Sequence, residues 1–304
     1  MRIILLIIFC IFNVNLFAQI KFSEDSALLI KPILNLREVL FYEISNSKKI
    51  KGEIFTSAIF KSKTLISIEL VDTVDGYWLK YKVHNVQSGN KKFLSEGVLD
   101  SLTQGAVLYF RMNKDRWYLD SASHTNMKNR IVRNIDSILA NRHFQISDSL
   151  ALVNTKNTLK ELSGLETFIR PLIAFNDIYY RKTFWKKWKF YNGYETNMLG
   201  KLGVQGFLEQ QIVKLSPEKN LAVLSIKFTA NKYEAAAVMS PLFKESLKII
   251  DKNAQVFIPD VMTKKTSYKY TIDFKRAIPT EIKIKYFSKF VAKIKNEFEM
   301  ILIN

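Results

Sequence analysis

Apolar and polar residues alternate through most of the first third of the chain, a pattern that predicts β-strands. A period of two places one set of side chains on a core and the other set toward solvent. In residues 76–86, GYWLKYKVHNV, every second residue from Tyr77 to Val83 is apolar. Further strand-like segments with short polar breaks predict an antiparallel meander; they are residues 36–45, 49–60, 64–71, 107–112 and 116–120.

The middle of the chain has a different period, which predicts helices. Met127, Ile131, Ile135 and Leu139 recur every four residues, as in an amphipathic helix. Two further helices are predicted at residues 149–162, where Ser163-Gly164 provides the end signal, and at residues 165–180.

Strands return in the last third of the chain. The clearest alternation of all is in residues 267–275, and a turn is predicted at Ala277 to Thr280. A helix is predicted at residues 231–250, in which Ser240-Pro241 marks either a kink or a new start. The other predicted strands are residues 203–215, 220–230, 280–287 and 297–303.

The order of these elements predicts an α+β fold with a large curved antiparallel sheet and helices packed on one face. We expect residues 19–304 to form a single domain, with two domains as the alternative, because no low-complexity linker separates the blocks. The blocks are strands at 36–120, helices at 123–181, strands at 184–231, a helix at 232–251 and strands at 266–303.

The N-terminus predicts export. Residues 1–18 combine one Arg, an apolar run and Leu16-Phe17-Ala18, the order of a secretory signal peptide. A permanent membrane anchor is the alternative, but Asn13 and Asn15 interrupt the apolar run. We therefore expect a protein of the periplasm or outer membrane, or a secreted one, with no transmembrane segment after signal cleavage. Cys10, the chain's single cysteine, would leave with the signal, so no disulfide is expected.

The formal net charge of +18 favours polyanionic partners. Export disfavours nucleic acid and leaves anionic lipid or acidic polysaccharide. An equally weighted explanation is a genome rich in AT codons, which would make the chain basic without a polyanionic partner, since net charge does not define a site.

Motifs for catalysis or cofactor binding are absent from the sequence. No glycine-rich phosphate loop, G-x-S-x-G elbow or H-E-x-x-H pair occurs. The three histidines, His84, His124 and His143, lie in different elements, and we expect solvated or capping roles for them. The sequence therefore nominates no catalytic residue, no metal ligand and no cofactor, and predicts a protein that is not an enzyme. A hydrolase with a site assembled from distant loops remains the alternative.

The apolar face of the predicted sheet suggests a ligand site, because a curved sheet closed by helices can leave an apolar cavity. Such residues more often fill their own core. The candidate cavity-lining residues are Leu79, Tyr81, Tyr268, Tyr270, Phe274 and Ile284.

The opposite, outward positions of the late strands carry lysines. Lysines on exposed strands usually form a solvated face that discourages edge pairing. They could also meet anionic lipid or polysaccharide. These lysines are Lys269, Lys275, Lys283 and Lys285.

The stretch from Tyr179 to Tyr194, YYRKTFWKKWKFYNGY, interleaves basic and aromatic residues. As a helix it would be an interfacial segment; we favour a hairpin that turns at Asn192-Gly193, the strongest short hairpin signal. In either form it is a candidate contact with an anionic envelope surface. The residues of this candidate patch are Lys182, Trp185, Lys186, Lys187, Trp188 and Lys189.

Two resemblances rest on short motifs. The signal ending in FAQ, the DGYWLKYKV strand and the late YTIDFKRAIPTEIKIKY look like exported α+β proteins of unknown function from Bacteroidota-type bacteria. The paired ID and IPTEI segments also resemble the late hairpin of periplasmic lipoprotein carriers. That second resemblance implies a half-open barrel whose apolar lining holds acyl chains, and thus a hydrophobic ligand. Neither resemblance supplies site residues.

Overall fold

The structure is a computed structural model, and most of the predicted strands and helices fall within the part of the chain that it describes. It describes residues 20–22, 27–30, 34–52, 58–73, 77–88, 102–112, 117–141, 152, 156, 159, 166–180, 183–185, 189–196, 203–250, 259–290 and 292–303.

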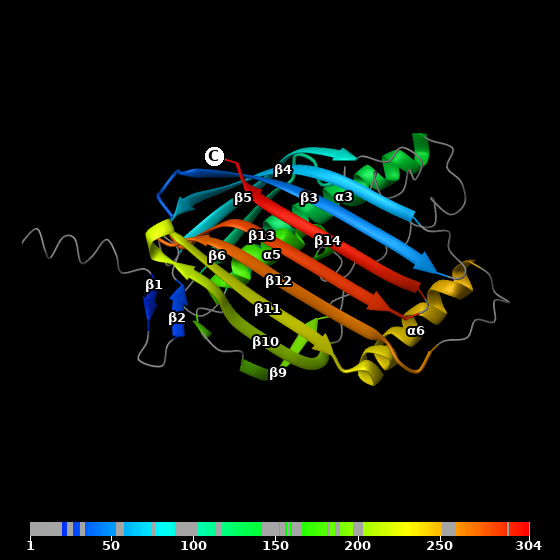
Figure 1. The fold of residues 1–304 in the computed structure, drawn as a ribbon. Coiled ribbons are helices and arrows are strands. Elements are labelled where there is room, and N and C mark those ends of the chain that lie inside the picture. The colour runs from blue at the N-terminus through cyan, green and yellow to red at the C-terminus, as the bar shows by residue number, and fades with distance from the viewer. Residues whose placement is uncertain are drawn as a thin grey trace, which may run out of the picture.

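The core of the fold is one antiparallel sheet of eleven strands, which we call the main sheet (Figure 1). Its strand order is β7-β6-β5-β4-β3-β14-β13-β12-β11-β10-β9. The first block supplies β3 (Val39–Gly52), β4 (Ala58–Asp72), β5 (Tyr77–Ser88), β6 (Val107–Met112) and β7 (Trp117–Leu119). The second block supplies β9 (Lys189–Thr196), β10 (Gly203–Ser216), β11 (Leu221–Ala230), β12 (Thr263–Asp273), β13 (Ile278–Lys289) and β14 (Ala292–Leu302).

Strands β3 and β14 join the two blocks in the middle of the main sheet. Their antiparallel register runs from Ala292 opposite Gly52 to Leu302 opposite Tyr42. From this seam each block continues outward as a meander, β3 to β7 on one side and β14 back to β9 on the other. The sheet is therefore continuous across segments that lie at opposite ends of the chain.

Helices α3 (Ser121–Asn141) and α5 (Glu166–Tyr180) lie on one face of the main sheet, which we call the inner face, behind the strands in Figure 1. The third helix of the described part of the chain, α6 (Lys232–Ile250), lies at the ends of the strands and packs on Phe228 of β11 through Ala235 and Ala236. Phe175 of α5 packs edge-on against Tyr42 of β3, with ring centroids 5.9 Å apart. The predicted fold class, a large curved antiparallel sheet with helices packed on one face, is confirmed.

A fully buried row of apolar side chains explains why α3 docks. Its predicted stripe is buried at Met127, Ile131 and Ile135 and belongs to the same core cluster as Phe110 of β6. The helix begins where Asp120 accepts a hydrogen bond from the Ser123 backbone N–H at 2.8 Å, as an N-cap residue does.

The remaining described elements are small. A three-stranded sheet pairs β1 (Ile20–Phe22), β2 (Ala27–Ile30) and β8 (Thr183–Trp185). A short 3-10 turn, η2 (Pro217–Lys219), links β10 to β11. Within the described residues, no helix combines the length and apolar character needed to cross a bilayer.

Three local predictions are wrong. Residues 49–60 are not a strand of their own: Lys49 to Gly52 complete β3, and Ala58 to Phe60 begin β4. The polar residues 45–49 are no break, because β14 and β4 provide a continuous ladder on both sides of β3. The late turn lies at residues 274–277 rather than at Ala277 to Thr280, with Ala277 in the left-handed region at φ 53°.

The predicted hairpin at Asn192-Gly193 is also wrong. Both residues lie inside β9, where Asn192 pairs with Phe207 and Gly193 with Gly206 of β10. A ladder along the whole of β9 outweighs the local turn preference of this dipeptide. The helix predicted at 149–162 falls mostly outside the described residues, although Leu152, Lys156 and Leu159 are helical.

Candidate functional site

The inner face contains the residues predicted to line a ligand cavity. Leu79, Tyr81, Tyr270 and Ile284 are at most 3% exposed and belong to one core cluster. Tyr268 and Phe274 are partly buried against the same cluster. The main sheet thus brings together residues from β5, β12 and β13, although Phe274 lies in the turn after β12. Tyr268 and Tyr270 stack on each other with ring centroids 6.3 Å apart, whereas Leu79 and Tyr81 lie five strands away on β5.

Four amide side chains interrupt this apolar interior. Asn176 of α5 is 0% exposed, and neither its Oδ1 nor its Nδ2 has a hydrogen-bond partner among the described residues. Within the described part of the chain, buried acceptors without a partner are also present at Asn296 Oδ1, Gln210 Oε1 and Asn46 Oδ1, although Asn46 also lines a hollow of the sheet. A buried polar group left without a partner costs about 1–3 kcal/mol, so these groups require an explanation.

Two buried tyrosines, Tyr42 and Tyr81, add phenol hydroxyl groups to the amides of this interior. The Tyr42 hydroxyl donates a hydrogen bond to the Pro279 carbonyl oxygen at 2.9 Å. Burial raises the pKa of Tyr42 and of Tyr81 far above the usual value for a phenol, so both rings stay neutral. The interior is therefore uncharged at these positions.

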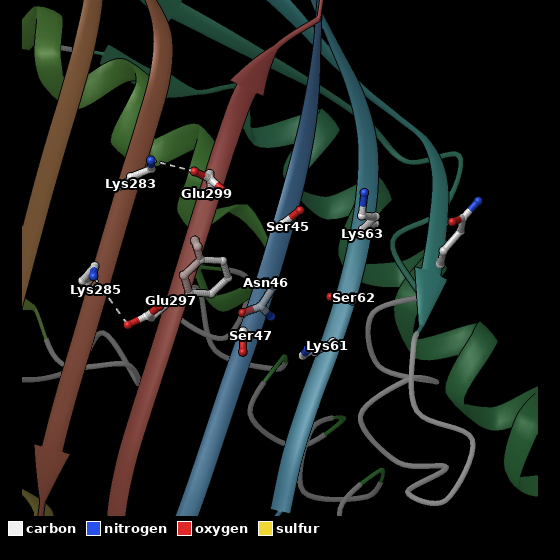
Figure 2. A pocket seen from close by; sticks show the side chains of 12 residues that line it. Ser45, Asn46, Ser47, Lys61, Ser62, Lys63, Lys283, Lys285, Glu297 and Glu299 are labelled. Carbon is white, nitrogen blue, oxygen red and sulfur yellow. Dashed lines mark ion pairs between the residues drawn. The ribbon is translucent and has the colours of Figure 1, made fainter.

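The opposite face of the main sheet, the outer face, displays the alternate residues of the same strands. A first hollow of about 560 Å³ lies on it across β4, β3, β14 and β13 (Figure 2). Lys61 and Lys63 stand on one side of the hollow and Lys283 and Lys285 on the other. Between the lysines lie hydroxyl and carboxylate groups, namely Ser45, Ser47, Glu297 and Glu299.

A second hollow of about 320 Å³ adjoins the first and shares Lys285 and Glu297 with it. It extends over β12 and β11 and adds Lys227, Lys265 and Lys295. We call the two hollows together the outer groove. Its lining contains seven lysines and two glutamates, a net charge of +5.

Ion pairs hold part of the outer groove in place. Lys283 Nζ lies 2.8 Å from both Glu281 Oε1 and Glu299 Oε1, and these two hydrogen bonds raise the pKa of Lys283. Burial alone would raise the pKa of Glu281, but hydrogen bonds from Lys283 and Thr271 lower it below the usual value. Lys285 is looser, 3.7 Å from Glu297 with 64% of its side chain exposed.

The lysines predicted to face outward separate into two groups. Lys283 and Lys285 line the outer groove. Lys269 is exposed on β12 next to Lys283 of β13, and Lys275 is exposed in the turn after β12. The sequence prediction missed Lys61, Lys63, Lys227, Lys265 and Lys295. These lysines alternate with buried residues, which could have indicated that they face outward. No local pattern, however, shows that β4 and β11 lie on opposite sides of β13 in the same sheet.

His84 also lies on the outer face, in contact with a neighbouring strand. Its Nε2 is 2.8 Å from Ser67 Oγ of β4, and its ring centroid is 5.7 Å from that of Phe41. Burial and the charge of Lys82 lower the pKa of His84. The prediction of a solvated histidine is therefore replaced by a half-buried one that links two strands. Among the described residues, no cluster of three potential metal ligands occurs.

The basic aromatic stretch is described only as backbone. Trp185 ends β8 and Lys189 begins β9, so both are in strands rather than in a helix. Lys182, Lys186, Lys187 and Trp188 lie outside the described residues. The candidate patch stays a prediction.

Comparisons with known proteins add a likeness of shape. No family model matches this chain, and no curated protein matches it. A solved structure entitled "Lipid-protein interactions in lipovitellin" is similar at a TM-score of 0.46 and 10% sequence identity. The likeness covers 90% of this chain and 26% of the lipovitellin chain, so this chain spans about a quarter of the length of that one.

Proposed function

We propose that this is an exported, non-enzymatic protein of the cell envelope that binds a lipid or other hydrophobic ligand between the main sheet and its helices. The observation that carries the proposal is Asn176, a fully buried amide on the helix that packs against the sheet, for which the described residues provide no hydrogen-bond partner. A ligand with an apolar body and a polar group would satisfy this amide and also suit the apolar residues around it.

The surroundings of Asn176 support an apolar ligand body. Phe175 and Leu172 of the same helix are 0% exposed, and the core cluster they join includes Tyr270 and Ile284 of the sheet. Burial of apolar ligand surface against such residues is favourable by about 25 cal/mol per Å². The interior is packed in this structure, so we expect ligand binding to separate α5 from the sheet.

The first experiment is native mass spectrometry of the protein purified from its own host without detergent. We expect a discrete mass addition that dissociates on activation and that organic extraction identifies as a lipid or another apolar molecule. Protein that carries no copurified ligand, and that also fails to bind a fluorescent fatty acid added in solution, would overturn the proposal.

A variant on α5 and a matched control on α3 make the test specific. Asn176→Leu removes the amide, and we expect it to weaken binding of the fluorescent fatty acid about tenfold, because the polar end of the ligand loses its partner. The matched control is Asn129→Leu, a change of the same chemistry at an exposed position of α3. Equal affinity of both variants would show that the amide does not meet the ligand.

A further inference from the structure

The outer groove is a second place where this molecule presents organised chemistry, on the face opposite the helices. It runs across β4, β3, β14, β13, β12 and β11, a distance of five strand spacings or about 24 Å. The lysine rows of β4 and β13 are three spacings, or about 14 Å, apart. These dimensions suit a single extended chain that lies across the strands.

The charges of the groove specify an anionic occupant. Seven lysines and two glutamates line it. Lys61, Lys265 and Lys285 are exposed, and they come from β4, β12 and β13, so cationic groups are spaced along the whole groove. Such a row of like charges attracts a polyanion.

The hydroxyl and carboxylate groups of the groove further restrict the chemical class of the ligand. Ser45 and Ser47 offer hydroxyl groups beside Glu297 and Glu299. Carboxylates repel a ligand that carries only negative charge, but they accept hydrogen bonds from hydroxyl groups. A ligand that bears both carboxylates and many hydroxyls matches the lysines and the glutamates together.

We propose that the outer groove binds an acidic polysaccharide. A surface of anionic lipid fits less well, because the lining also carries carboxylates at Glu297 and Glu299, which would repel its headgroups. An acidic peptide would meet the same carboxylates without the hydroxyl groups to satisfy them. The proposal is independent of the interior ligand, since the groove and Asn176 lie on opposite sides of the main sheet.

The test measures binding of fluorescently labelled polygalacturonate by anisotropy. The groove variant is Lys61→Gln/Lys265→Gln/Lys285→Gln. The matched control is Lys214→Gln/Lys219→Gln/Lys275→Gln, which removes three exposed lysines outside the groove. Circular dichroism and thermal melts check that both variants remain folded.

We expect the full chain to bind polygalacturonate and the groove variant to bind about tenfold more weakly, since three exposed ion pairs together are worth about that factor. The control should stay within about twofold, and added salt should weaken binding through screening. Neutral dextran, polyglutamate and vesicles of phosphatidylcholine and phosphatidylglycerol serve as competing probes.

Four outcomes would overturn the proposal. They are no binding of polygalacturonate, equal losses in the groove variant and the control, polyglutamate binding as tight as polygalacturonate binding, and binding to the anionic vesicles alone. Fatty-acid binding by the groove variant provides the internal check. It should match that of the unchanged protein, so a failure of the groove proposal is distinguishable from a failure of the proposed function.

Discussion

The inner and outer faces of the main sheet are made of alternate residues of the same strands, yet they differ in almost every property. Ile284 is 1% exposed in the core, whereas its neighbour Lys285 has 64% of its side chain exposed. The inner face is apolar, covered by helices and interrupted by amides that have no partner within the described structure. The outer face is charged and hollowed. Stability therefore resides mainly on one face, and electrostatic recognition is available on the other.

The largest expected effect is a difference in the free energy of unfolding between a substitution on the inner face and one on the outer face. Ile284→Ala should lower the free energy of unfolding by about 2–5 kcal/mol, because it leaves a cavity in the core. Lys285→Ala, one residue away, should change it by no more than about 0.5 kcal/mol. Urea unfolding of both variants measures the difference. Equal losses would break the comparison.

A second pair of variants contrasts a buried hydrogen bond made by β3 with an exposed ion pair between β3 and β4. Tyr42→Phe removes the donor to the Pro279 carbonyl and should cost about 1–3 kcal/mol, since a buried acceptor is left without its partner. Lys63→Gln removes the ion pair to Glu43. The Lys63 side chain is 59% exposed and that of Glu43 42%, so the free energy of unfolding should change by about 0–1 kcal/mol. A larger loss from Lys63→Gln in chemical denaturation would contradict this ranking.

A third change should increase stability. Asn176→Leu replaces a buried amide that has no partner in the described structure with an apolar side chain of similar size. We expect a gain of about 1 kcal/mol in the ligand-free protein. The measurement is the urea midpoint after ligand extraction. A loss of stability would show that the amide is satisfied within the fold and would remove the main support for the interior ligand site.

The smallest effect concerns pH and the outer face. The pKa of His84 is lower in the folded state than the ordinary value of 6.5, so the unfolded chain binds more protons between these two values. Stability therefore falls as the pH drops below 6.5. Glu38 and Glu281 have a lowered pKa in the folded state, so their contribution to stability is lost only as the pH falls below about 4.5. His84→Gln should flatten the dependence of the thermal midpoint between pH 5 and 6.5, and an unchanged slope would contradict the assignment.

Alternation alone predicted which residues of the late strands face the core. Tyr270 and Ile272 of β12 and Ile282 and Ile284 of β13 are buried, while Lys269, Lys283 and Lys285 point outward. This succeeds because a strand with one covered face must place its apolar side chains on that face, whatever its neighbours are.

Local signals failed where another strand decided the outcome. Asn192-Gly193 continues β9 because β10 pairs along its whole length. Residues 45–52 extend β3 because β14 and β4 flank them. The free energy of a hydrogen-bonded ladder depends on the partner strand, and the partner is not visible in a window of the sequence.

By itself, the sequence determined the classes of the elements, their order and the division of each strand into an apolar and a charged side. Only the tertiary structure decided that β3 pairs with β14, that lysines of β4 and β13 face each other across a hollow, and that Asn176 is buried with no partner among the described residues. The physical reason is the distance along the chain over which each feature is determined. Side-chain alternation follows from local backbone geometry, whereas these contacts join residues far apart in the chain and arise only when the whole sheet assembles.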